Sequence, residues 1–238
     1  MDNAIYTSLT RQSGLMREMR VIANNIANAD TTGFRREGVV FSEYMKSLDS
    51  TGETLSMANA RGRLVDLTQA GLSQTNGPLD MGIEGEGFFM IETPDGPRLT
   101  RAGNFLTSPE GELVTPDGHR VLDEGRAPIT LPQNPGAVSV GPDGTITANA
   151  VPIARIGLFR PSDPNSILHQ GGTSFSFEGE AEPAADARLR QGFLEGSNVD
   201  PMFEISRMIE VQRAYEMGQA MLEREDQRIR NAITSMTR

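Results

Sequence analysis

The chain has 238 residues, of which 37% are hydrophobic and 5% aromatic, with a formal net charge of -10 and no cysteine. A core formed by a chain of this length is usually richer in apolar residues, so we expect part of the chain to bury apolar surface against another chain. The acidic balance argues against nucleic acid or anionic lipid as a partner. The missing cysteines exclude disulfides, thiolate catalysis and cysteine metal sites.

The N-terminal segment 1–34 is predicted to form a long helix. Neither glycine nor proline occurs between Gly14 and Gly33, and the side chains at positions 5, 8, 12, 15, 19, 22 and 26 alternate spacings of three and four. That spacing is typical of a helix that packs along a partner helix. Gly33 is free to adopt the left-handed conformation that follows a last helical turn. The segment lacks a basic start followed by an apolar stretch, so we expect no cleaved secretory signal.

Residues 35–75 are polar and show no strong periodicity, and we interpret them as a semi-ordered connector. Residues 76–196 are predicted to form an all-β domain, because the dipeptides Asp95-Gly96, Asp117-Gly118 and Asp143-Gly144 are hairpin turn signals. Short apolar strands are expected between these turns, at 87–91, 112–115, 137–140, 145–147 and 153–159. Strands at this spacing predict an antiparallel meander, barrel or sandwich.

Residues 197–238 are predicted to form a second long helix, in which Asp200 caps the N-terminus and Pro201 takes the first helical position. A stripe with alternating spacings of three and four continues to the end of the chain. The predicted fold is therefore α+β, with long terminal helices that pair in a coiled-coil-like manner, a connector and a central all-β domain. No stretch is apolar for the length that a membrane span needs.

Sequence patterns for catalysis are missing, so we predict no enzymatic activity, no cofactor and no metal site. The two histidines, His119 and His169, lie beside turn residues and are expected to be solvated. Gly82, Gly85 and Gly87 have the wrong spacing for a dinucleotide loop and precede a predicted strand instead of a helix. Close backbone approach at a strand entry explains these glycines better.

Three stretches resemble the family of flagellar rod and hook axial proteins. The first, 21–34, reads VIANNIANADTTGF; the second, 78–89, reads PLDMGIEGEGFF and continues to Gly118; the third, 191–199, reads QGFLEGSNV and leads into MIEVQRAY at 208–215. The resemblance covers both ends and the centre of the chain. The start MDNAIY and the short connector are similar to proximal rod subunits, whereas Gln212–Tyr215 is nearer the distal pattern. A distal rod or hook-type subunit is therefore the first alternative, and a phage-tail-like β protein with helical ends is a remote one.

The resemblance implies an inner domain of paired terminal helices (D0) and an outer β domain (D1). Subunits of such a family stack around a hollow axis, with other rod subunits and copies of themselves as partners, and form a drive shaft that crosses the periplasm. They leave the cytoplasm through the type III export apparatus without a cleaved peptide. The expected assembly interface comprises Ile5, Leu15, Met19, Ile22, Asn24, Asn25, Ile26, Asn28, Thr32, Gly33, Phe34, Ile205, Met208, Gln212, Tyr215, Gln219, Leu222, Asp226, Ile229 and Ile233.

Plainer interpretations of these residues stay open. An apolar stripe usually belongs to the core of its own domain, although here the stripes lie at opposite ends, outside the turn-rich middle. The asparagines at positions 24, 25 and 28 are poor helix formers, which either helix-end chemistry or hydrogen bonds between subunits would explain. Gln212, Gln219 and Asp226 interrupt the stripe every seven residues. They either face the surface, or set the register of a helix pair, or border a polar channel.

Overall fold

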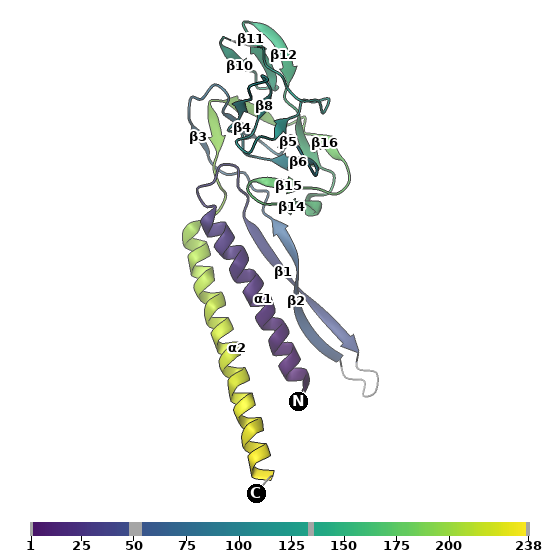
Figure 1. Cartoon of the computed structure of the whole chain (residues 1–238), viewed down its shortest axis with the longest axis vertical. Coiled ribbons are helices and arrows are strands. Elements are labelled where there is room, and N and C mark those ends of the chain that lie inside the picture. Colours follow the sequence, from purple (N-terminus) through teal and green to yellow (C-terminus); the bar gives the residue numbers. More distant parts are fainter. Residues whose placement is uncertain (1, 48–53, 133–135, 237–238) are drawn as a thin grey trace. The chain divides into compact units, whose positions relative to one another are not determined.

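The computed structural model describes residues 2–47, 54–132 and 136–236, and within them the chain is α+β (Figure 1). It has an N-terminal helix, a central region formed mostly of β-strands and a C-terminal helix. The chain divides into two compact units. The helical unit contains the described residues of 1–27, 37–64 and 200–238, and the β unit contains those of 28–36 and 65–199.

The N-terminal helix of the helical unit, α1 (Asp2–Ala27), confirms the predicted helix, but it ends at Ala27, and residues 28–36 belong to the β unit. The chain turns directly after α1, where the Thr31 amide donates to the Asn28 carbonyl oxygen at 3.2 Å. The C-terminal helix, α2 (Pro201–Met236), is also confirmed. Its cap is the predicted one, since Oδ1 of Asp200 accepts from the amides of Met202 and Phe203 at 2.9 and 3.2 Å.

The expectation of a semi-ordered connector is wrong for much of 35–75. Strands β1 (Glu37–Ser47) and β2 (Thr54–Val65) pair in a two-stranded sheet, and the short strand β3 (Leu72–Gln74) follows. Strand pairing uses backbone N–H and C=O groups, which every residue except proline supplies. A polar sequence without apolar alternation therefore pairs here, although its pattern did not indicate strands.

The β unit contains a nine-stranded sheet, a three-stranded sheet formed by β10, β11 and β12, and two small sheets in which β17 pairs with β4 and β18 with β3. The strands and the short 3-10 helix η1 of this unit, after β3, are β4 (Met81–Glu84), β5 (Phe88–Thr93), β6 (Gly96–Thr100), β7 (Leu106–Thr107), β8 (Leu113–Val114), β9 (Arg120–Val121), β10 (Val138–Val140), β11 (Thr145–Ala148), β12 (Val151–Arg155), β13 (Leu158–Pro161), η1 (Pro164–Ser166), β14 (Leu168–His169), β15 (Ser174–Ser176), β16 (Ala181–Pro183), β17 (Arg188–Gln191) and β18 (Phe193–Glu195).

The three predicted Asp-Gly turns all connect antiparallel neighbours. Gly96 joins β5 to β6, Gly118 joins β8 to β9, and Gly144 joins β10 to β11, each with a positive φ. The predicted strand 153–159 is two strands instead of one. Strand β12 pairs with β11, and β13 pairs with β5 and β16. The chain leaves one sheet for the other near Gly157, where a Cβ atom would lie 2.7 Å from the Asp123 carbonyl oxygen.

Strand β5 lies at the centre of the β unit and is buried on both faces. Phe88 and Met90 belong to one apolar cluster, whereas Phe89 and Ile91 belong to another. Successive side chains of a strand point to opposite faces, so a continuous apolar run supplies both clusters. No helix of the described part of the chain is long and apolar enough to cross a membrane.

Candidate assembly interface

The two helices contact each other through a small apolar seam. Leu15 and Ile22 of α1 and Val211 of α2 are buried in it. The partly buried side chains that pack against these three are Met19, Ile26, Met208, Ala214 and Tyr215. Burial of a few aliphatic side chains contributes about 1.5–3 kcal/mol each, so the seam is a modest source of stability for two long helices.

An ion pair borders the seam. Glu18 is buried and accepts hydrogen bonds at Oε1 from Nε and Nη2 of Arg207, at 3.0 and 2.8 Å. The hydrogen bond with Glu18 raises the pKa of Arg207 above its ordinary value, and Glu210 adds to the effect. This ion pair connects α1 to α2 at one point along their length, because each helix supplies one partner.

Asn25 fixes the start of β1 against α1. Its buried side chain accepts from the Glu37 amide at 3.0 Å and donates to the Glu37 carbonyl oxygen at 2.9 Å. The same amide nitrogen donates to Oε2 of the buried Glu204 at 3.2 Å. Asn25 therefore acts within one subunit. Asn28 accepts from the Thr31 hydroxyl in the turn after α1, whereas Asn24 is exposed.

The stripe predicted on α2 divides between two faces of the helix. Met208, Tyr215 and Leu222 are half-buried. Val211 and Gly218, which lie between them along the helix, face α1. Exposed members of the predicted stripe are Ile205, Gln212, Gln219, Asp226, Ile229 and Ile233. The heptad of Glu204, Val211, Gly218 and Glu225 was not predicted from the sequence, because a glycine and two acids do not form an apolar pattern. Ile5 lies in α1, but its side chain is outside the described residues.

Helix α2 exposes many large apolar side chains. Met202 is 73%, Met217 68% and Met236 86% exposed. The other exposed large apolar residues of this helix are Phe203, Ile205, Ile209, Met221, Ile229 and Ile233. These exposed apolar side chains occur along the whole length of the helix, from Met202 to Met236.

Four predicted interface residues lie in the β unit, namely Asn28, Thr32, Gly33 and Phe34. Phe34 is fully buried, and its ring lies 5.3 Å from that of His169, which in turn lies 5.1 Å from Phe175. The expectation that His169 is solvated is therefore wrong, because its ring lies between those of Phe175 and of Phe34, and Phe34 is far away in sequence. Gly33 is also buried and donates to the Glu195 carbonyl oxygen at 2.8 Å, whereas Thr32 is half-buried.

A buried charge cluster stabilises the same region. Glu195 forms ion pairs with Arg35 and with Arg101, and these side chains are at most 2% exposed. Burial lowers the pKa of Arg101 to about 10, although Glu195 opposes the shift. The cluster brings together residues 160 and 94 positions apart in sequence, so no local pattern indicated it.

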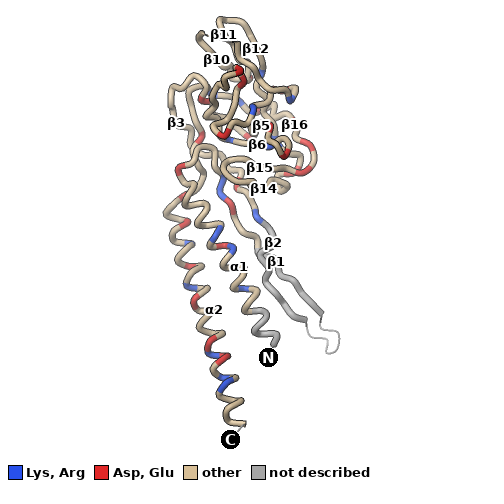
Figure 2. Tube along the Cα trace, in the orientation of Figure 1, with Lys and Arg blue, Asp and Glu red and all other residues tan. Residues whose placement is uncertain are grey.

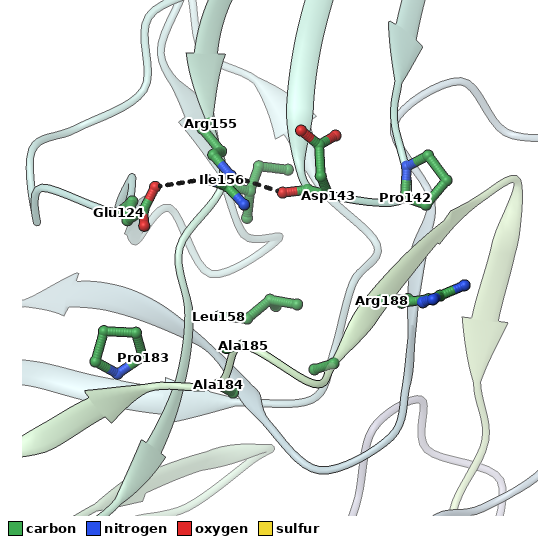
Figure 3. A pocket seen from close by; sticks show the side chains of 11 residues that line it. Glu124, Pro142, Asp143, Arg155, Ile156, Leu158, Pro183, Ala184, Ala185 and Arg188 are labelled. Atoms are coloured by element: carbon green, nitrogen blue, oxygen red, sulfur yellow. Dashed lines mark hydrogen bonds and ion pairs between the residues drawn. The ribbon is translucent and has the colours of Figure 1, made fainter.

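The cleft of the β unit drawn in Figure 3 shows no catalytic arrangement. It has a volume of about 400 Å³ and is lined by Glu124, Asp143, Arg155 and Arg188 together with proline and alanine side chains. Arg155 donates to the Asp143 backbone carbonyl oxygen and forms an ion pair with Glu124. The described residues contain no group of three acidic or histidine side chains that could hold a metal ion.

Three family models match the chain in order. The model described as flagella basal body rod protein matches residues 5–35, the flagellar hook protein FlgE/F/G D1 domain matches 82–148, and the flagellar basal body rod FlgEFG protein C-terminal region matches 190–235. The flagellar basal-body rod protein FlgF of Caulobacter vibrioides is 40% identical over 239 residues, which cover 98% of this chain and 97% of the relative. The chain belongs to the family of flagellar basal-body rod proteins.

Within the rod protein family the similarity is nearest to the FlgF type. FlgF of Salmonella typhimurium is 33% identical with 91% of each chain covered, whereas FlgG of Bacillus subtilis is 28% identical with 98% of each chain covered. This finding confirms the sequence resemblance. The chain is a structural subunit of the basal-body rod and no enzyme, as the family is a structural one.

Proposed function

We propose that this rod subunit polymerises helically with copies of itself and with other rod subunits, through its terminal helices, into the hollow drive shaft of the flagellum. The observation that carries the proposal is the exposed apolar surface of α2, from Met202 to Met236. A single small unit leaves this surface in water, whereas neighbouring subunits would cover it. A contact between different faces of neighbouring copies extends into a helix when its rotation does not close a ring.

The proposed layout assigns residues 1–34 and 197–238 to a coiled-coil-like inner domain (D0), 35–75 to a connecting region and 76–196 to an outer β domain (D1). The apolar seam around Leu15, Ile22 and Val211 supports pairing of the helices. The interface residues predicted from the sequence are part of this proposal, and among them Ile233 is 57%, Ile205 44% and Ile229 37% exposed.

We further propose that the subunit leaves the cytoplasm through the type III export apparatus, with no cleaved signal peptide, and joins the part of the rod that crosses the periplasm. Its ends would complete their folding when the subunit joins the rod, because a small seam offsets little of the entropy lost by ordering two long helices. Neither nucleic acid nor membrane insertion is part of the proposed function. A distal or hook-type position along the axis is the alternative placement.

Purified basal bodies test the proposed assembly. The chain, detected by antibody in basal bodies from its own bacterium, should be present in the rod fraction, and cells that lack it should not swim. Absence of the chain from intact basal bodies would contradict the proposal. Circular dichroism of the free monomer tests the folding step, and full helicity of both ends in isolation would count against it.

Two substitutions test the proposed interface residues. Replacing Asn24 with Ala should weaken motility if its amide bonds to a neighbouring subunit, and normal rods would assign it no such role. Replacing Gln212, Gln219 and Asp226 together with Leu should impair assembly or export, because polar side chains at these positions would set register or border a channel. Unchanged motility of the triple variant would remove both roles.

A further inference from the structure

The loop between β3 and β4 contains the single Asn-Gly pair of the sequence, Asn76-Gly77. An asparagine that precedes glycine can be attacked by the next backbone nitrogen, because glycine has no Cβ atom to hinder the closure of a cyclic imide. Asn76 is exposed and has a φ of +59°, in the left-handed region that most residues avoid. Water therefore reaches the side chain whose amide would react.

A chain of hydrogen bonds leads from the attacking nitrogen to a carboxylate. The Gly77 amide donates to Oγ1 of Thr75 at 3.3 Å, and the Thr75 hydroxyl donates to Oδ2 of Asp80 at 2.6 Å. A Cβ atom built on Gly77 would collide with the Asp80 side chain, so the carboxylate covers this glycine closely. The Thr75 hydroxyl can therefore take the amide proton while it passes its own proton to Asp80.

The carboxamide under attack has a hydrogen-bond donor of its own. Nε2 of Gln74 donates to Oδ1 of Asn76 at 2.8 Å. Negative charge develops on this oxygen when the nitrogen adds to the side-chain carbon, and a donor already in place stabilises that charge. The amides of Thr75 and Asn76 donate to the Gly192 carbonyl oxygen at 2.8 and 3.1 Å. The folded β unit therefore holds the nucleophile, the base and the donor in one turn.

We propose that Asn76 is an autocatalytic deamidation site, at which the fold accelerates the reaction. The Gly77 nitrogen forms a bond to Cγ of Asn76, the bond from Cγ to Nδ2 breaks, and the proton relayed to Asp80 leaves with the departing amine as ammonia. Water then opens the cyclic imide at either carbonyl carbon, which gives an aspartate or an isoaspartate at position 76. The net reaction consumes water and releases ammonia, so it needs no cofactor, oxidant or reductant. It does not depend on the proposed function.

Either product changes this turn. It adds a negative charge beside the Asp80 carboxylate, in a chain whose net charge is already -10 and whose described acidic residues are drawn in red in Figure 2. An isoaspartate also inserts a methylene group into the backbone between two points that Gly192 holds, the Asn76 amide and the Asp80 carbonyl oxygen, at 3.1 and 2.7 Å. We expect older molecules to have looser pairing of β3 with β18 and of β4 with β17.

Mass spectrometry of the full chain tests the proposal, since it distinguishes an amide from an acid at each asparagine. The purified chain is incubated at neutral pH, either folded or unfolded in guanidinium chloride, which reports the reactivity of the Asn-Gly sequence alone. The folded chain should convert Asn76 about 10²-fold faster, at the lower end of what a positioned general base contributes. Asn165, which is exposed and precedes Ser166, should remain an amide over the same period. A folded rate at or below the unfolded rate would overturn the proposal.

Substitutions in the relay separate the contribution of the fold from that of the sequence. Thr75→Val removes the hydroxyl and should reduce the folded rate to the unfolded one, whereas Thr75→Ser retains the hydroxyl and should keep the folded rate. Asp80→Asn retains an oxygen that accepts from Thr75 but removes the base, so it should slow the reaction as much as the valine does. Circular dichroism establishes that each variant is folded. A folded valine variant that converts Asn76 as fast as the parent chain would overturn the relay.

Discussion

Gly33 occupies a position that admits no other residue. Its φ is +71°, in the left-handed region, and a Cβ atom built there would lie 2.2 Å from the Ala102 nitrogen. The glycine therefore has two roles. It turns the chain after α1, and it lets residues 28–36 pack closely against the rest of the β unit. The sequence indicated the first role, and only the structure shows the second.

Substitution of Gly33 with Ala should destabilise the β unit by about 2–5 kcal/mol, which combines the cost of a positive φ with that of overpacking. Urea unfolding monitored by circular dichroism measures the loss. Gly172→Ala is the control, since Gly172 has φ +56° and nothing within 4 Å of its added Cβ. The Gly172→Ala variant should lose only about 1–2 kcal/mol of unfolding free energy. Equal losses for the two variants would contradict the close approach of residue 33 to Ala102.

The Glu195 carboxylate is the ion-pair partner of two buried arginines and only accepts hydrogen bonds. Its Oε1 accepts from Arg35 and from the Ala70 amide, and its Oε2 accepts from Arg101. Glu195→Gln should cost about 3–5 kcal/mol, because it leaves buried cations without a counter-charge. Glu124→Gln removes the partner of the exposed Arg155 and should cost at most about 1 kcal/mol. The free energies of unfolding of the two variants test this prediction. A loss of about 1 kcal/mol or less for Glu195→Gln would show that its ion pairs are not essential to the β unit.

The ionisation of the Asp66 carboxyl makes the stability of the β unit depend on pH. The Thr68 hydroxyl donates to its carboxylate at 2.5 Å and, as the largest cause, lowers the pKa of Asp66 below its ordinary value. A carboxyl whose folded pKa is depressed stabilises the fold above the unfolded pKa of about 3.9, and this contribution is lost as the pH falls through the folded value. Thr68→Val should raise the pKa of Asp66 in an NMR titration, whereas Thr68→Ser should keep it low. An unchanged pKa in the valine variant would assign the shift to another group.

At the scale of elements, both helices and the three Asp-Gly hairpins follow from local sequence. Helices need a run without proline in the interior, which segments 1–27 and 200–236 supply, and Asp200 adds an N-terminal cap to the second. The pairing of β1 with β2 did not follow from the sequence, because backbone pairing requires no apolar alternation. Residues 153–159 divide into β12 and β13 because the two parts pair with strands of different sheets. The local sequence does not indicate which sheet each part joins.

The helix pair should depend on its seam and not on its exposed apolar residues. Ile22→Ala, at a position 3% exposed, should destabilise the pairing by about 2–5 kcal/mol and lower the temperature at which the helical circular dichroism signal is lost. Leu9→Ala removes an exposed side chain of the same helix and should change the stability of the free monomer by at most about 0.5 kcal/mol. A larger effect of the Leu9 variant on the free monomer would indicate that this side chain is covered within one subunit.

At the scale of the whole molecule, the two compact units have very different cores. The seam of the helical unit buries three apolar side chains fully, whereas the β unit has two clusters that include many buried phenylalanine, isoleucine and leucine residues. Thermal unfolding of the full chain should therefore show two transitions, with the helical signal lost first. Ile22→Ala should lower only the first transition and Gly33→Ala only the second. A single transition that both variants shift equally would contradict independent units.

The sequence by itself determined the terminal helices, the cap of α2, the turn-rich β centre and, through three ordered motifs, the family of rod proteins. These features depend on neighbouring residues, whose conformational preferences act locally. Tertiary structure alone decided which face of each helix is covered, and it placed Val211 and Gly218 in the seam where the sequence suggested Gln212 and Gln219. It also brought Arg35, Arg101 and Glu195 together, because a buried charge is stable only beside partners that the fold carries there from distant segments.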